Sequence, residues 1–588
     1  MKRFAGTGLM IAVLAALAGY YFLVDLPAER REREEKDRQE RVLVFRFEDV
    51  LRMAYDHGDT HVRAEKQNNV WHLTEPLKVK ADAMALGTFL NQLEEARFTR
   101  VVEEDPKDLA RYGLDSPRFR IQINTPELGD KTVLIGDAAP SGHNLYFKRA
   151  DQKQVLLVPG FPDNWVKTVF HFRDKTILDY RTRDLTAFTL KQPETRVEMI
   201  LEKDQWRLTE PVKAKGDSAA IEDLLNTIRQ ARITAFDEED PKDLARYGLD
   251  RPALEFSARA GENTWTLWVG KESKPSSFYA RRASTPNIFQ IPKRVKEAVE
   301  TPYLELIDKQ VFNFQEADVA RLEIRSGSET LRLTPVPGPP PAWKIESPIQ
   351  APADTSAVNS LLYDLKETRA EKFMTFGEPG NFGLAPPKKT LTLTLKDGRT
   401  LELALGNSNL EKNEWFASRR LDQAVFVLKK EQVDKLFRSL KDLRDRRLFT
   451  FSEKEADRIV LEYPQQRFEL QRGQESWTLT RPESLGPLQP FIGNDVLWTL
   501  NKLRFERKVD ALPEGTDAFK SPALSVSVFD QQKKLLAKLQ VGGPVKGEKL
   551  RWARVEGRPG FYAVPDRLLT EIPHTLEKFR AALKESED

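Results

Sequence analysis

The chain has 588 residues, more than one hydrophobic core usually supports, so several domains are expected. Its 93 Lys and Arg residues nearly balance its 90 Asp and Glu residues, which gives no whole-chain charge argument for a nucleic-acid partner. The absence of cysteine from the sequence excludes disulfides, thiol nucleophiles, Cys-based zinc sites and an acylated lipoprotein cysteine.

The N-terminal segment has the character of a membrane anchor. Residues 4–24 carry no charged side chain, and at ~1.5 Å per residue a helix of that length spans the ~30 Å hydrocarbon core of a bilayer. Lys2 and Arg3 precede the run, so the positive-inside rule predicts a cytoplasmic N-terminus and an extracytoplasmic arm. The alternative is a cleaved signal peptide, because Ala16-Leu17-Ala18 resembles a small-residue cleavage site.

The rest of the chain is an internal repeat. The sequence EEDPKDLARYGLD at residues 103–115 recurs unchanged at residues 238–250. Two more divergent copies follow, and all four share a tryptophan, an arginine and a glycine at offsets between 134 and 137 residues. The shared positions are Trp71, Trp206, Trp343 and Trp477; Arg97, Arg232, Arg369 and Arg504; and Gly136, Gly270, Gly406 and Gly542.

The boundaries between copies follow from recurring junction sequences, DKTILDY at Asp174, DKQVFNF at Asp308 and DRRLFTF at Asp445. No Gly/Ser-rich linker separates the copies, so we expect a semi-rigid array of touching modules. The fourth copy is degenerate, because AFKSP stands where the first has YGLDSP. The predicted divisions are a transmembrane signal-anchor at residues 1–27, a charged juxtamembrane linker at 28–40, and modules at 41–174, 175–308, 309–445 and 446–588.

Each module is predicted to have an α+β fold of about 135 residues. In the second copy, the alternation in TRVEMIL and QWRLTEP indicates a β-hairpin. A helix follows, with Asp217 at its N-cap and apolar residues at helical spacing, and Asp82 and Asp354 are the equivalent caps. Four alternating segments, FRIQI, TVLIG, NLYFKR and QVLLVP in the first copy, predict an antiparallel meander. A closing helix such as DNWVKTVF completes the module.

A short helix is predicted between the first helix and the meander. In the segment DPKDLARYGL, Asp105 is placed to be the N-cap and Pro106 the first helical residue. Asp108 then interacts with the helix dipole, and Gly113 ends the helix. The tyrosine and glycine of this segment, Tyr112 and Gly113 with Tyr247 and Gly248, belong to the repeat signature.

The shared residues have a structural and a functional interpretation. A tryptophan at a fixed strand position is more often a core residue than a binding platform. An arginine at the end of a helix, such as Arg97, usually binds last-turn carbonyls or a carboxylate, and the alternative is a repeated contact with a ligand or partner. The strand-ending glycines, such as Gly136, are interpreted as turns that need a positive φ.

Two groups of residues are candidate cation sites, but neither is predicted to bind metal. The carboxylates of EEDPKDLARYGLD are explained by helix capping. His57, Asp59 and His61, with His72 nearby, lie where the second copy has the hairpin turn KQPET, which favours a polar turn. The motifs GxSxG, HExxH, GxxxxGK[ST] and GxGxxG are absent from the sequence. We therefore predict no catalytic residue, no metal and no cofactor.

The order of motifs, W-x-L-x-x-P, a helix, YGL-x-x-P and a strand ending in glycine, resembles a bacterial family known as domain of unknown function 4340. The resemblance covers nearly all of the chain after residue 40 and is most specific at residues 111–117 and 246–252. It implies a membrane-anchored envelope protein, of a kind often encoded beside gliding-motility-type ABC transporter components. It implies no catalytic residues, and the fourth copy lacks its YGL signature.

Two functions fit these observations. The first is a non-enzymatic protein of the bacterial inner membrane, with a periplasmic arm that serves as an accessory or scaffold for an ABC-type transporter or another envelope assembly. The second is a protein that holds glycan, lipid or peptide in clefts between modules, and a hydrolase is a distant third. A deep apolar cleft between modules would favour the second function, and closed junctions would favour the first.

Overall fold

The computed structural model describes residues 35–140, 142–339, 341–377, 380–474 and 476–583, together with Met10 and Leu14. The predicted membrane segment at residues 4–24 lies outside the described residues, apart from Met10 and Leu14. Of the helices in the described part of the chain, none is long and apolar enough to cross a membrane. The chain divides into two compact units, Met1–Asp308 and Lys309–Asp588, and the division coincides with the predicted end of the second module.

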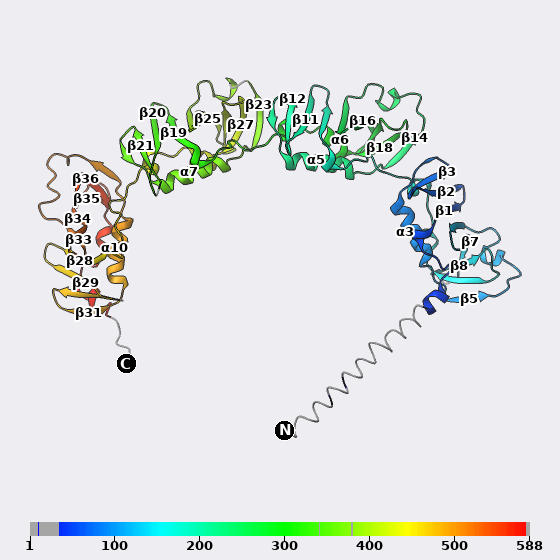
Figure 1. Cartoon of the computed structure of the whole chain (residues 1–588), viewed down its shortest axis with the longest axis horizontal. Helices are drawn as coiled ribbons and strands as arrows, with labels where there is room; N and C mark the ends of the chain where they lie inside the picture. The colour runs from blue at the N-terminus through cyan, green and yellow to red at the C-terminus, as the bar shows by residue number, and fades with distance from the viewer. Residues whose placement is uncertain are drawn as a thin grey trace. The chain divides into compact units, whose positions relative to one another are not determined.

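Four antiparallel sheets of nine strands follow one another along the chain, two in each unit, and all four have the same topology (Figure 1). In the first sheet the strand order is β4-β3-β2-β1-β6-β7-β8-β9-β5. Its strands are β1 Arg52–His57, β2 Thr60–Gln67, β3 Val70–Glu75, β4 Val79–Lys80, β5 Arg100–Glu103, β6 Phe119–Thr125, β7 Gly129–Ala138, β8 Asn144–Arg149 and β9 Val155–Pro159.

The other three sheets repeat this order with the same spacing of elements. The second contains β10 Ala187–Lys191, β11 Arg196–Glu202, β12 Gln205–Glu210, β13 Ala214–Lys215, β14 Ala235–Glu238, β15 Leu254–Ala260, β16 Asn263–Lys274, β17 Ser277–Arg282 and β18 Ile288–Pro292. The third contains β19 Val319–Ser326, β20 Glu329–Val336, β21 Ala342–Ser347, β22 Ala351–Pro352, β23 Lys372–Phe376, β24 Lys389–Leu395, β25 Thr400–Asn409, β26 Glu414–Arg419 and β27 Ala424–Lys429. The fourth contains β28 Ala456–Glu462, β29 Arg467–Arg472, β30 Trp477–Arg481, β31 Leu485–Leu488, β32 Arg507–Val509, β33 Leu524–Asp530, β34 Leu535–Pro544, β35 Leu550–Val555 and β36 Arg558–Pro565.

One long helix per sheet connects the two sheet edges. In the first sheet β4 and β5 lie at opposite edges, so the helix between them crosses the sheet face. The predicted caps are confirmed, since Asp82 accepts hydrogen bonds from the backbone N–H groups of Met84 and Ala85, both at 3.1 Å, and Asp217 and Asp354 cap in the same way. The long helices are α3 Ala83–Glu94, α5 Ser218–Gln230, α7 Thr355–Glu367 and α10 Phe491–Lys502.

The main core lies between this helix and the sheet. In the first sheet, Leu86, Phe89, Leu90 and Leu93 of α3 pack with Tyr55 and other inward-facing strand residues. A smaller apolar cluster on the other sheet face contains Tyr112, Leu114 and Val155. Successive strand residues alternate between the faces, as Val155 and Leu156 of β9 do.

The predicted α+β module is confirmed in part, and strands dominate it. The hairpin and the meander are continuous halves of one nine-stranded sheet, a pairing that the sequence did not indicate. The closing helix DNWVKTVF is a 3-10 turn, Pro162–Asn164, followed by the single turn α4 Val169–Phe172. The remaining short α-helices are α6 Lys293–Val299, α8 Lys430–Leu436, α9 Leu440–Leu443, α11 Leu568–Glu571 and α12 Leu576–Arg580.

The predicted short helix is a 3-10 helix of one turn, Ala110–Tyr112, with an equivalent at Ala245–Tyr247. The prediction that Asp105 caps it is wrong, because Asp108 accepts the hydrogen bond from the Ala110 backbone N–H at 3.0 Å. Asp105 instead pairs with Lys153 at 3.0 Å. Gly113 ends the helix as predicted, with a φ of 61°.

Candidate interaction sites

The repeated glycines and the Tyr-Gly segments of the signature contact each other. Gly136 lies inside β7, where a Cβ would be 2.1 Å from the Tyr112 carbonyl oxygen. The glycines of the other three sheets face the carbonyls of Tyr247, Phe382 and Ala518 in the same way, at 2.2, 2.2 and 2.4 Å. The prediction that these glycines supply a positive φ is wrong, because Gly136, Gly270, Gly406 and Gly542 all lie within strands without one. They are glycines because a backbone turn packs directly on the strand.

The tyrosines fasten the same turn to the edge strand. The Tyr112 hydroxyl donates a 2.6 Å hydrogen bond to Glu103 of β5, and Tyr247 donates one of 2.7 Å to Glu238 of β14. These bonds to a carboxylate raise the pKa of both phenols. The carboxylates of the repeated segment are thereby used in capping and in pairing. In the described residues, no group of three or more His, Asp or Glu side chains is arranged to hold a metal ion.

The histidines of the first hairpin turn point to separate partners. His57 stacks on Phe119, and its Nδ1 lies 2.9 Å from the Arg118 carbonyl oxygen. His61 Nδ1 lies 2.8 Å from Asp56 Oδ1. His72 Nδ1 lies 3.2 Å from a backbone carbonyl, that of Val70. Among the described residues these histidines are not gathered into a group of three or more possible metal ligands.

The four repeated tryptophans are core residues. Trp71, Trp206, Trp343 and Trp477 are 7, 6, 7 and 1% exposed. Trp477 donates from Nε1 to Asn494 of α10 at 3.1 Å. A Cβ at Gly493 would lie 2.3 Å from the Trp477 ring, so this helix approaches the ring directly. Burial on this scale leaves no platform for a ligand.

The repeated arginines lie two or three residues beyond the last residue of the long helices, close to the predicted helix ends. Each forms an isolated β-bridge with a residue near the start of its module, in the pairs Arg41 with Arg97, Thr176 with Arg232, Gln310 with Arg369, and Arg447 with Arg504. The predicted pairing with a carboxylate is found at three positions, one of which is Arg232, whose Nη1 lies 3.9 Å from Asp174 Oδ1. Arg97 contacts Asp37 at 3.0 Å, and Arg504 contacts Asp354, the cap of α7, also at 3.0 Å.

A second repeated arginine was missed by the sequence analysis. Arg149, Arg282 and Arg419 end β8, β17 and β26, and each donates to backbone carbonyls at the start of its own module. Arg282, for example, donates from Nη1 to the Thr176 carbonyl at 2.7 Å. The signal was present, because NLYFKR, SFYARR and EWFASR all end in arginine.

Within each unit, the segment that joins the two modules forms backbone hydrogen bonds with both of them. In the first unit, the Asp174 backbone N–H donates to Lys80 at 3.0 Å, and the Ile233 N–H donates to Lys175 at 2.8 Å. In the second unit, Asp445 and Phe505 donate in the same way to Pro352 and Arg446, at 3.0 and 2.9 Å. Successive modules within a unit are therefore in contact without a flexible linker.

An arginine packs across each of these junctions. Arg173 lies 3.5 Å from the centroid of Phe236 and forms a salt bridge with Glu239. Arg444 lies 4.8 Å from the centroid of Phe505. The equivalent residue at the end of the second module is Ile307, which is buried. Each junction within a unit therefore has an arginine packed on a phenylalanine ring. The residue before Asp308 is an isoleucine, so the sequence does not repeat this arginine there.

Cationic residues of the second module lower the pKa of Asp82, the capping aspartate of the first module. Burial alone would raise the pKa of Asp82, but the Ala85 N–H, Lys175 and Arg232 together hold that pKa below its usual value. Lys175 Nζ lies 3.3 Å from Asp82 Oδ2. The charge of Arg232 thus acts on this cap, whereas Arg504 forms a salt bridge with the equivalent cap, Asp354.

A cleft of about 550 Å³ lies at the junction of the first two sheets. Seven of its lining residues are charged, so it is not the deep apolar cleft that would favour a lipid or another apolar ligand. The lining residues are Lys78, Val79, Lys80, Arg173, Asp174, Thr176, Asp179, Glu239, Arg282, Thr285, Pro286 and Asn287.

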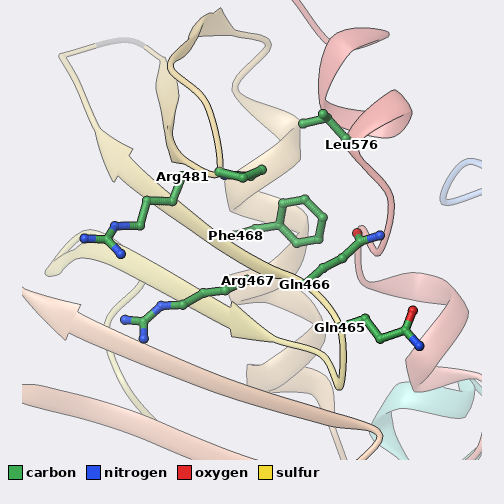
Figure 2. Close-up of a pocket in the computed structure, with 7 residues that line it drawn as sticks. Gln465, Gln466, Arg467, Phe468, Arg481 and Leu576 are labelled. Carbon is green, nitrogen blue, oxygen red and sulfur yellow. The ribbon is translucent and has the colours of Figure 1, made fainter.

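A second hollow, of about 590 Å³, belongs to the fourth sheet alone (Figure 2). Arg467 and Arg481 extend side by side on one side of Phe468, while Gln465 and Gln466 point to the other (Figure 2). Both guanidinium groups face one carboxylate, that of Glu469, at 2.6 and 3.9 Å. Because their charge is offset inside the fold, they carry little argument for an anion site.

Exposed aromatic residues are concentrated on the long helices of the second unit. Tyr363 of α7 is 59% exposed, and Trp498 and Phe491 of α10 are 55 and 52% exposed. Tyr363 and Trp498 occupy one repeat position, ten residues after the β-bridges at Ala353 and Leu488, where the first two modules have asparagine, Asn91 and Asn226. Aligning the copies along this helix would have shown the change from asparagine to aromatic. We call Tyr363, Phe491 and Trp498 the aromatic helix surface.

The comparison with protein families agrees with the repeat. A family described as Domain of unknown function (DUF4340) matches residues 71–205, 206–339 and 343–491. The chain belongs to this family. No curated protein matches the chain.

The DUF4340 matches are out of phase with the sheets. They begin at or beside the repeated tryptophans of β3, β12 and β21, so each match runs from the third strand of one sheet into the next sheet. The strands β32 to β36, which complete the fourth sheet, lie beyond the last match. The folded repeat is therefore a shifted version of the repeat that the family describes.

Proposed function

We propose that the chain is a non-enzymatic scaffold of the bacterial envelope, held in the inner membrane by its N-terminal segment with its modules in the periplasm. Its partner is a protein of an ABC-type transporter or another envelope assembly. The uncharged run at residues 4–24 behind Lys2 and Arg3 supports the anchor. The family resemblance supports the envelope setting.

The residues that the modules share support a scaffold rather than an enzyme. The tryptophans fill the core, the glycines admit a backbone turn, and the tyrosines hold that turn to the sheet edge. The arginines lie at module entrances and junctions. The residues that recur between modules are thus used in folding and in joining modules. Recognition of a partner is left to residues that differ between copies.

The aromatic helix surface is the observation that carries the proposal. Tyrosine and tryptophan are enriched at the centres of protein interfaces because they combine a large apolar area with few rotatable bonds. On α10, Asn494 and Asp495 lie exposed between Phe491 and Trp498, at the spacing of one helix face. On α7, Asn359 and Ser360 precede Tyr363 in the same way. This mixture of aromatic and polar groups fits a protein partner, whereas a lipid surface would favour a continuous apolar face.

The first prediction concerns the two aromatic residues that replace asparagine in the second unit. Each is changed to the asparagine that the modules of the first unit have at that position. The double variant Tyr363→Asn/Trp498→Asn should bind the envelope partner at least about tenfold more weakly, because hot-spot aromatics contribute about 2 kcal/mol or more each. Its stability should change by less than about 0.5 kcal/mol, because both side chains are exposed. The partner is identified by crosslinking in native membranes, and binding is measured by its recovery.

Leu421→Ser is the matched control, because Leu421 is 82% exposed but lies on a loop of the third module and not on a long helix. It should recover the partner as the wild type does. Equal recovery with the double variant would remove the aromatic helix surface from the interface. A partner recovered only through residues of the first unit would move the interface there.

The second prediction concerns membrane attachment. A periplasm-active reporter fused after Asp588 should be active, and the chain should stay in the membrane fraction after a salt wash. A chain without residues 4–24, exported by a cleavable signal, should lose partner binding because it leaves the membrane. Salt-released wild-type protein lacking residues 1–18 would instead support the signal peptide.

A further inference from the structure

The cleft at the junction of the first two sheets is formed by three separate parts of the first unit. Lys78 and Lys80 come from the β4 edge of the first sheet, and Asp174 and Asp179 come from the junction segment. The other wall includes Glu239, after β14, and the residues between β17 and β18 that end at Asn287. A site with such walls exists only when the two modules are joined.

Every acidic side chain that lines the cleft is already engaged. Asp179 contacts Lys80 at 3.0 Å, and Glu239 binds the guanidinium group of Arg173. Asp174 accepts hydrogen bonds from the Thr176 N–H and hydroxyl at 3.0 and 2.7 Å. The cleft therefore offers no unpaired carboxylate to a cationic ligand.

Several donors of the same cleft are not engaged. Asn287 is 3% exposed, and its amide nitrogen Nδ2 has no hydrogen-bond partner among the described residues. Arg282 donates from Nε and Nη1 to Thr285 and to backbone carbonyls, but Nη2 has no such bond within the described part of the chain. Lys78 is exposed and makes no ion pair with any described residue. The groups of the cleft without a partner are hydrogen-bond donors, and two of them are cationic. A ligand that satisfies them must offer acceptor oxygens.

The module junction itself explains why Asn287 lacks a partner. At the equivalent position of the first module, Gln154 donates its amide hydrogen to Glu104. The equivalent carboxylate in the second module, Glu239, is bound by Arg173 of the first module instead. A buried amide donor without a partner is unfavourable for folding, so folding alone does not explain an asparagine at this position.

We propose that this cleft binds a small organic oxyanion, a carboxylate or a phosphate. Its oxygens take hydrogen bonds from Asn287, and Lys78 and Arg282 offset its charge. The two arginines of the fourth-sheet hollow differ, because Glu469 lies against both of them. The inference does not depend on the scaffold role or on the aromatic helix surface, which lies in the other unit.

The test is isothermal titration of the full chain with inorganic phosphate, glycerol 3-phosphate and succinate, with maltose as an uncharged probe. One saturable site is expected for an oxyanion probe and none for maltose, and the better probe separates phosphate from carboxylate. Lys78→Glu and Asn287→Leu should each weaken binding about tenfold or more, because each removes a charged or charge-assisted contact.

Asn287→Leu also separates a ligand contact from a structural role. It deletes an unpaired donor while keeping side-chain volume, so the unliganded melting temperature should not fall, while the ligand-induced rise should disappear. Lys191→Glu is the charge-matched control, because Lys191 is an exposed residue of the second sheet outside the cleft, and it should bind as the wild type does. The proposal is overturned if no oxyanion probe saturates, or if all three variants bind alike.

Discussion

Gly270→Ala is expected to destabilise the second sheet by about 3 kcal/mol, the upper part of the range for overpacking a well-filled site. The new Cβ would lie 2.2 Å from the Tyr247 carbonyl oxygen and 3.0 Å from the Leu249 side chain. A backbone carbonyl cannot rotate aside as a flexible side chain does, so the turn must separate from β16. Hydrogen exchange with mass spectrometry measures the result, because it resolves each sheet of a multidomain chain.

The control distinguishes close approach from backbone conformation. Gly261, in the turn between β15 and β16, has a φ of +57° and no atom within 4 Å of the Cβ position. Gly261→Ala should therefore cost only the left-handed conformation, about 1 kcal/mol. If Gly270→Ala costs no more than Gly261→Ala, the contact with Tyr247 is not what requires glycine at this position.

A comparison of Gly113 with Gly136 shows which parts of the fold can be predicted from local sequence. A glycine that ends a short helix, such as Gly113, is recognised from its neighbours, and so are the helix caps at Asp82, Asp217 and Asp354. The role of Gly136 is different, because it depends on a carbonyl 24 residues earlier in the sequence. Local periodicity carries no information about such a contact, although the joint recurrence of both motifs in the modules was a clue to it.

The sheet order was beyond prediction for the same reason. Alternation identified the strands of hairpin and meander, but it does not say which strands are neighbours. The pairing of β1 with β6 joins the two halves of the sheet, and the pairing of β5 with β9 places the end of α3 at the far edge. Both are long-range contacts, and they convert two small sheets into one of nine strands.

The candidate sites were less predictable than the fold, because they depend on differences between copies. The positions that all modules share are used in folding and in joining modules. Asn287 and Trp498 attract attention only when compared with Gln154 and Asn226 at the same module positions. In a repeat protein, residues that all modules share indicate how the modules fold, and residues that differ between modules indicate where a partner or ligand binds.

Trp206→Ala should cost about 3–5 kcal/mol in the second module, the range for truncating a buried large aromatic residue. Trp206 is 6% exposed and packs edge-on against Phe188 at 5.4 Å. Phe188 packs in turn against the fully buried Phe256, so the cavity would open in the core of the module. Hydrogen exchange should quicken across residues 187–292 and remain slow in the fourth sheet.

Trp498→Ala provides the contrast, because it removes the same side chain from an exposed helix position. Exchange in the fourth sheet should be unchanged, and only partner binding should weaken. The paired outcome separates the two kinds of tryptophan in this chain. If Trp206→Ala leaves exchange unaltered while partner binding is lost, Trp206 acts at the surface and the core interpretation of the repeat signature is wrong. If both variants unfold their modules, α10 depends on its exposed face, and the aromatic helix surface is part of the fold rather than an interface.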